Sequence, residues 1–475
     1  MELGFDQPFT ITLKPECREA LAGKVEWTQI DGPTLKTTVE QNGYTLRGRT
    51  RPLSELHPDP IPAGIVPFSP RTRGQYAFKA SFRGNGGASD VIVRLASVAR
   101  SSGLPSVALG TRIFLGGTGW HVKSPARGGR AEIEVGGPLE AFRPDARGRW
   151  LLEDGQGTEL ALVAGLHSDT PLDCGRSECH QKETEAFQTS RMTSVLHRGL
   201  LGVFADYDPA CAVGCHSAGE PGLADGGFDA VRRELGLSSH FYKGAGGWDA
   251  LPRALRRVGG VTCTACHGPG AIPVPSARWA VLRTDVCAVC HDAPPRYGHV
   301  AAWQHTRMAK ADADPDARHG AECRGCHTTA GFLERNGVRK PDPLAPDVPL
   351  GISCAACHAP HGPSFGLRQL REIQLPSDIT LPASAAPSRV CVNCHFPAAG
   401  KLVFGAMDKA TPPHAEIGCT GCHGAGRVRG EGHDFKVSNQ SCGKCHDAGV
   451  PKAPDFQARA RELFQKITGK TPGPR

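Results

Sequence analysis

The first 168 residues alternate polar and apolar positions, the pattern of half-buried β-strands. The alternation predicts strands over Lys24–Ile30, Gln75–Phe82 and Asp90–Ala99. Turn dipeptides separate the alternating segments, as at Asn42-Gly43 and Asp154-Gly155. Because short strands at regular spacing are typical of β-sandwiches, we expect sandwich architecture in this region.

From residue 169 onward, regular periodicity is sparse. Ala224–His240 and Asp455–Ile467 space Phe, Val and Leu as helices do. Proline-rich loops are expected at Pro341–Pro349 and Pro376–Pro387. The fold class predicted is therefore a β-sandwich N-terminal region followed by a loop-rich, mostly α-helical or irregular domain, with boundaries at 1–104, 105–168 and 169–475.

An internal repeat divides the β region in two. Phe68-Ser-Pro-Arg-Thr-Arg-Gly-Gln-Tyr76 and Phe142-Arg-Pro-Asp-Ala-Arg-Gly-Arg-Trp150 share aromatic, proline and glycine positions. Each copy follows a tryptophan (Trp27, Trp120) that is expected to pack between sheets. The segment resembles the PKD/Ig-like modules of secreted bacterial proteins, although the first copy has Arg71 where the pattern has Asp. One larger irregular β domain is the alternative.

Charge and hydropathy exclude two classes of partner. The net charge is +8, but the basic residues are scattered among acids and form no basic block, so nucleic acid is not an expected partner. The apolar runs are far shorter than the roughly 18 residues that a membrane helix requires, so no membrane span is expected.

The cysteines occur in a pattern that indicates a specific cofactor chemistry. Of 19 cysteines, 18 form nine pairs, and each pair is followed directly by a histidine. Seven pairs have the spacing Cys-x-x-Cys-His, and the pairs that begin at Cys174 and Cys211 have four and three intervening residues. The pairs are Cys174 and Cys179, Cys211 and Cys215, Cys263 and Cys266, Cys287 and Cys290, Cys323 and Cys326, Cys354 and Cys357, Cys391 and Cys394, Cys419 and Cys422, and Cys442 and Cys445.

This spacing suits covalent attachment of haem c. Two thiols add to the vinyl groups of one porphyrin, and the next histidine binds the iron as proximal ligand. Zinc ribbons also use cysteine pairs, but neither a ribbon nor a disulfide framework gives the adjacent histidines a role. We therefore expect nine haem c groups, with proximal ligands His180, His216, His267, His291, His327, His358, His395, His423 and His446.

Nine further histidines beside the motifs are candidates for the distal position, which predicts bis-histidine ligation at every iron. They are His167, His197, His240, His299, His305, His319, His361, His414 and His433. His167 lies at the domain junction, where His57 or His121 is an alternative. Two imidazoles favour ferric iron, so low reduction potentials are expected. The pairing of distal histidines with haems is not readable from the sequence.

The C-terminal region resembles multihaem c-type cytochromes of bacterial respiration. The resemblance rests on the nine motifs, the Cys-His-x-Pro-His run ending at His361, and the spacing of His414 and His433 around the last motifs. It implies electron transfer, and some members are subunits of extracellular cytochrome filaments. Full ligation favours a carrier over an enzyme. The alternative is a multihaem reductase with one open haem, acting on a small nitrogen, sulfur or oxyanion substrate.

Location and partners follow from this chemistry. Haem c is attached outside the bacterial cytoplasmic membrane, so we expect a periplasmic, cell-surface or extracellular protein with a secretion signal. The N-terminal residues do not have the pattern of such a signal. Redox partner proteins or an extracellular acceptor are the expected partners, and a homopolymer is an open alternative. The unpaired Cys17 is expected to be an ordinary thiol, with an intermolecular disulfide as the alternative.

Overall fold

The structure is a computed structural model in which part of the chain is described. It forms two compact units, residues 1–298 with 343–348 and residues 299–342 with 349–475, and each is treated by itself. The described residues are 2–3, 8–13, 25–31, 34–41, 43–49, 64–65, 75–84, 87–97, 104–135, 140–169, 180–204, 207, 212–238, 247–270, 281–293, 297–303, 306–309, 323–341, 351–362, 364–365, 369–375, 381, 383–395, 418–423, 433–436 and 465.

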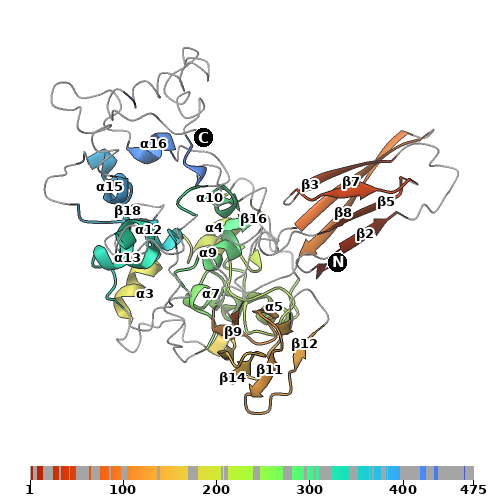
Figure 1. Cartoon of the computed structure of the whole chain (residues 1–475), viewed down its shortest axis with the longest axis horizontal. Helices are drawn as coiled ribbons and strands as arrows, with labels where there is room; N and C mark the ends of the chain where they lie inside the picture. The colour runs from red at the N-terminus through yellow and green to blue at the C-terminus, as the bar shows by residue number, and fades with distance from the viewer. Residues whose placement is uncertain are drawn as a thin grey trace. The chain divides into compact units, whose positions relative to one another are not determined.

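Two sheets form the first β module (Figure 1). One has the order β1-β8-β7-β3 and the other β2-β5-β4. Phe9, Leu46 and Phe78 are buried together between them, since these residues belong to strands of both sheets. The strands are β1 Glu2–Leu3, β2 Pro8–Thr12, β3 Glu26–Asp31, β4 Thr37–Val39, β5 Thr45–Arg49, β7 Gln75–Gly84 and β8 Gly87–Ser97.

The second β module also has two sheets, in the orders β12-β13-β10-β6 and β11-β14-β15-β9. Strand β6 lies at residues 64–65, so a segment preceding β7 completes a sheet of this second module. The domain boundary at 104 stays a prediction. The strands are β6 Gly64–Ile65, β9 Ser106–Ala108, β10 Ile113–Gly116, β11 His121–Ser124, β12 Ile133–Glu134, β13 Ala141–Phe142, β14 Gly148–Glu153 and β15 Glu159–Gly165.

The predicted strands and the second tryptophan are confirmed. Strands β3, β7 and β8 overlap the three ranges expected from alternation, and Trp120 is buried in the core of the second module. In the second repeat copy, the Phe142 and Trp150 rings meet edge to face with centroids 5.0 Å apart. The Phe68–Gly74 part of the first copy lies outside the described residues.

The remainder of the described chain consists of short helices joined by turns, as expected, and none of these helices exceeds eight residues. None is long and apolar enough to cross a bilayer. In the first unit they are η2 His167–Asp169, α3 Gln181–Gln188, α4 Val195–Leu200, α5 Phe228–Glu234, α6 Arg253–Arg257, α7 Cys263–His267 and α9 Thr284–His291, with strands β16 Asp292–Ala293 and β17 Tyr297–Gly298.

The second unit contains the same kind of elements. Its helices are α10 His299–Trp303, α12 Arg324–His327, α13 Thr329–Arg335, α14 Cys354–Cys357, η6 Ala383–Ser388, α15 Arg389–His395 and α16 Cys419–His423, with strands β18 Ser364–Phe365 and β19 Leu370–Arg371. Thr328 caps α13 by accepting a hydrogen bond from the Gly331 amide. The N-terminal β-sheets are thus followed by a helix- and loop-rich region, which confirms the predicted fold class.

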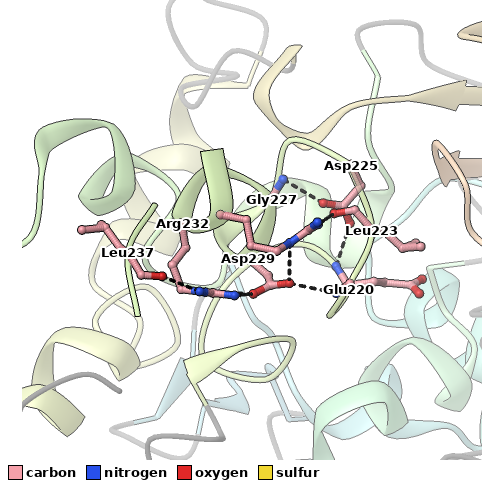
Figure 2. A network of polar contacts seen from close by, with 9 residues as sticks. Glu220, Leu223, Asp225, Gly227, Asp229, Arg232 and Leu237 are labelled. Carbon is pink, nitrogen blue, oxygen red and sulfur yellow. Dashed lines mark hydrogen bonds and ion pairs between the residues drawn. The ribbon is translucent and has the colours of Figure 1, made fainter. Parts of the chain in front are cut away.

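A polar network closes the loop that follows the motif ending at His216 (Figure 2). Asp225 accepts hydrogen bonds from the Gly227 amide at 2.9 Å and the Glu220 amide at 2.7 Å. One oxygen of Asp229 pairs with Arg232 at 2.7 Å, and the other accepts from the Gly222 amide at 2.8 Å. Both carboxylates are therefore occupied by donors of the chain, and their role is to fix this loop.

Candidate haem-attachment sites

Each described motif of regular spacing is one turn of helix. Cys263 and Cys266 are three residues apart in α7, so their thiols lie on one face of the turn, and His267 ends the helix. Gly268 follows with φ of 80°, a left-handed conformation that ends the helix at once. Helices α9, α15 and α16 likewise contain both cysteines of a motif and end at its histidine. Helix α14 contains both cysteines but ends at Cys357, with His358 in extended conformation, and α12 begins directly after Cys323.

Thirteen of the predicted attachment thiols are described; none of these is in a disulfide, and all are partly buried. They are Cys215, Cys263, Cys266, Cys287, Cys290, Cys323, Cys326, Cys354, Cys357, Cys391, Cys394, Cys419 and Cys422. The predictions for Cys17, Cys174, Cys179, Cys211, Cys442, Cys445 and His446, and for the distal candidates His240, His305, His319 and His414, lie outside the described residues.

The described attachment thiols differ in their tendency to ionise. Burial raises the pKa of Cys266 to about 11 and that of Cys357 to about 11, so both are uncharged near neutral pH. Hydrogen bonds with Cys391 and Ser388 instead lower the pKa of Cys419 to about 6. Within the described part of the chain, no three His, Cys, Asp or Glu side chains gather around a common point.

The predicted proximal histidine of α16 has a main-chain hydrogen-bond partner. Nδ1 of His423 donates a hydrogen bond to the Phe435 carbonyl oxygen at 2.8 Å, which would leave Nε2 available to a metal. Phe435 has φ of 52°, an unusual conformation for a bulky residue, and its carbonyl is the group presented to His423. A main-chain partner of this kind fixes both tautomer and ring orientation.

His216, the proximal histidine of a stretched motif, is buried beside Tyr207, with ring centroids 5.7 Å apart. Burial, with the neighbouring His291, lowers its pKa to about 4. Its Nδ1 is buried and has no hydrogen-bond partner among the described residues. Burial, with His423 nearby, also lowers the pKa of His395. These rings are therefore neutral near pH 7, the form that binds a metal.

The described distal candidates occupy different surroundings. His197 stacks on Trp248 with centroids 4.8 Å apart, and His361 is exposed. His433 lies beside two histidine rings, with centroids 4.7 Å from His299 and 6.2 Å from His358. The structure thus brings one predicted distal histidine next to a predicted proximal one.

His167 is tied to a haem motif. Its Nδ1 is 2.8 Å from Oγ1 of Thr264, a residue between the two cysteines of α7. Burial lowers the pKa of His167 to about 4. Ser106 in β9 donates a hydrogen bond to the Pro269 carbonyl just beyond the same motif. Sequence reasoning missed Thr264 and Ser106, because their partners are more than 90 residues away.

Motifs distant in the sequence lie close together. In the first unit, Sγ of Cys290 is 3.5 Å from the Gly214 carbonyl oxygen within the stretched motif. In the second unit, the thiols of Cys391 and Cys419 share a hydrogen bond. Arg335 contacts the thiols of both Cys326 and Cys394. The side chains that would hold neighbouring porphyrins are therefore in direct contact.

The C-terminal region matches a known family in part. Residues 286–359 and 368–424 match the family described as cytochrome c554 and c-prime, a span that contains five of the regular motifs. This match supports a multihaem c-type cytochrome with haem-based electron transfer. None of the curated proteins compared with the chain matches it.

Solved structures similar to the chain are remote. They include the endo-fucoidan hydrolase MfFcnA9 of glycoside hydrolase family 107 (12% identity, 34% of this chain and 32% of that chain, TM-score 0.15). Others are extracellular domains 3–5 of Drosophila OTK (10%, 34% and 61%, 0.13) and InvD of Yersinia pseudotuberculosis (12%, 34% and 55%, 0.14). The chain spans less than two thirds of each. At these TM-scores the likenesses carry no argument.

Proposed function

We propose that the chain is an electron conduit carrying nine haem c groups, one at each cysteine-pair motif, with two histidines at every iron. When bound, haem supplies one-electron chemistry at its iron. The chain's cysteines tether the group, and the following histidine orients it. The contact between thiols of separate motifs, as between Cys391 and Cys419, carries this proposal, because groups tethered there become neighbours.

The geometry also favours one distal pair. Two imidazoles that held one metal from opposite sides, each at about 2 Å, would have ring centroids about 6 Å apart. The 6.2 Å between His358 and His433 fits this spacing, whereas 4.7 Å between His299 and His433 is too short. His433 is therefore the proposed ligand opposite His358, and His299 serves a different iron.

The conduit is proposed to work in the periplasm or at the cell surface. Haem is attached to protein through thioether links in that compartment in bacteria. Covalent tethers of this kind hold the cofactor to short helices that have little core of their own. Redox proteins or an extracellular acceptor are its proposed partners. Assembly of copies into a filament would extend the same proposal, with electrons passing between copies as well as within one.

Intact-mass spectrometry of the matured chain tests the haem content. Nine porphyrin increments are expected after denaturation, because thioether links survive unfolding. The double variant Cys263→Ala/Cys266→Ala should lose one increment and no more. A mature chain whose mass lacks most of the increments would overturn the proposal.

Spectroscopy distinguishes a conduit from a reductase. A conduit with two histidines at each iron should be low-spin when oxidised, and its reduced form should not bind carbon monoxide. One high-spin ferric signal in the unmodified protein, with carbon monoxide binding on reduction, would instead support catalysis at an open haem.

A further inference from the structure

Arg335, the last residue of α13, lies between two haem-attachment motifs. Its Nη1 is 3.0 Å from Sγ of Cys326, and its Nη2 is 3.7 Å from Sγ of Cys394. The first sulfur belongs to the motif Cys323–His327, and the second belongs to Cys391–His395. One guanidinium therefore touches a predicted attachment point of each motif.

The same contact is held by neighbouring polar groups. Nη2 of Arg335 donates to the Asn393 carbonyl oxygen at 3.2 Å and also to its side-chain oxygen. Nδ2 of Asn393 donates to Oδ1 of Asn336 at 2.9 Å, and Nδ2 of Asn336 donates back at 3.3 Å. Asn336 directly follows Arg335, and Asn393 directly precedes Cys394. Their hydrogen bonds to each other and to Arg335 therefore fix the arginine side chain beside the second motif.

The first motif makes room for this side chain. Gly325 lies between Cys323 and Cys326, and a Cβ added there would stand 2.9 Å from Cδ of Arg335. Any larger residue would displace the arginine from the sulfur of Cys326. The glycine inside the motif and the arginine after it thus form one arrangement.

We propose that the Arg335 guanidinium is a fixed positive charge close to two haems, those tethered at Cys326 and Cys394, and that it raises the reduction potentials of both. Adding an electron makes each site more negative, and a fixed positive charge stabilises that form. Arginine keeps its charge at all accessible pH values. This inference rests on the proposed function, since it requires haem at both motifs.

The place of the charge on each porphyrin supports this role. The vinyl groups that form thioethers lie on the edge opposite the propionates. A cation beside the thioether sulfurs is therefore held away from the propionates of the same two haems and is not neutralised by them. Haems tethered at Cys323–His327 and Cys391–His395 would also be neighbours for electron transfer, although the motif at Cys354 lies between these two motifs in the sequence.

Spectropotentiometric titration of the full holoprotein tests the proposal with three variants. Arg335→Gln removes the charge, Arg335→Lys keeps it without the planar fork, and Lys340→Gln removes an exposed charge from the same segment. Arg335→Gln should lower the potentials of two haems, with about a three- to tenfold fall in the reduced-to-oxidised ratio at fixed potential. That ratio corresponds to about 30 to 60 mV at 59 mV per tenfold.

Arg335→Lys should restore most of the shift, and Lys340→Gln should leave the two potentials unchanged. A purely structural role would give equal effects for Gln and Lys, and that result overturns the proposal, as does an unchanged titration. In a Cys323→Ala/Cys326→Ala background, Arg335→Gln should move one haem instead of two. Porphyrin content is measured on the same samples, so missing haem would count against the proposed function and not against this inference.

Discussion

At the scale of single residues, the two hydrogen-bonding edges of histidine explain how the chain prepares ligands. The Phe435 carbonyl holds Nδ1 of His423, and Thr264 holds Nδ1 of His167. The Phe435 contact leaves Nε2 of His423 available to a metal, whereas Nε2 of His167 lies 4.0 Å from a carboxylate oxygen of Asp225. His433, two residues before Phe435, approaches His358, so one short segment supports two proposed sites.

Replacing His433 tests the proposed pairing. His433→Ala should convert one low-spin haem to a high-spin haem that binds carbon monoxide when reduced, because one iron loses its sixth ligand. Lys436→Ala, at an exposed position of the same short segment, should change neither property. Ferric EPR and carbon monoxide difference spectra measure both.

A second step identifies which iron is affected. In a Cys354→Ala/Cys357→Ala background, which lacks the haem of His358, His433→Ala should create no new carbon monoxide site. His299→Ala should still create one there. If His433→Ala opens a site in this background, the pairing with His358 is wrong. His433→Met is a milder variant, for which one haem potential should rise.

At the scale of elements, close approach between the second β module and α7 depends on glycine. A Cβ on Gly268 would stand 2.2 Å from the Ser106 carbonyl oxygen of β9, and one on Gly165 would stand 3.0 Å from Cα of Gly270. The segment after the motif therefore lies directly against β9 and β15. Residues with side chains would separate the strand edge from the motif.

Replacing Gly268 should destabilise the protein. Gly268→Ala places a Cβ against β9 and also strains a backbone with φ of 80°, so we expect a loss of about 2 kcal/mol or more. Gly157→Ala is the matched control, because φ is 82° there but nothing lies within 4 Å. It should lose only about 1 kcal/mol. Thermal unfolding followed by circular dichroism compares them, and equal losses would show that the contact with Ser106 is unimportant.

At the scale of the whole chain, the second β module is part of the haem-bearing structure of the first unit. Thr111 donates to Glu220 at 3.1 Å, and Leu104 packs with Val286 of α9 beside Cys266. These contacts add to those of Ser106 and His167. The module thus supports segments near three of the motifs.

Truncation should show that the two β modules differ in their effect on haem content and melting temperature. A chain that begins at residue 104 keeps all the contacts to α7 and α9 and loses only the first module and the short strand β6. We expect it to retain full haem content. A chain that begins at residue 169 should mature with fewer haems or a lower melting temperature. Equal haem content and melting temperature in the two would contradict this role of the second module.

The sequence alone determined the chemistry of the motifs. Two thiols and a histidine within five residues predict a short helical segment, and the described helices α7, α9, α15 and α16 each contain all three residues of a motif. Alternation likewise predicted β3, β7 and β8. Successive side chains of a strand point to opposite faces of the sheet, so a sheet with one buried face has an apolar residue at every second position. Both signals are local, so neither requires knowledge of what lies across the fold.

Only the tertiary structure decided which sites are neighbours. Arg335 and Cys394 are 59 residues apart, and His167 and Thr264 are 97 residues apart. No periodicity connects such pairs, since they meet through turns whose directions depend on packing of the whole unit. The closeness of His433 to His358, and the strand that residues 64–65 add to the second module, arise in the same way. Local spacing therefore predicts where a cofactor is tethered, and long-range packing fixed what surrounds those positions.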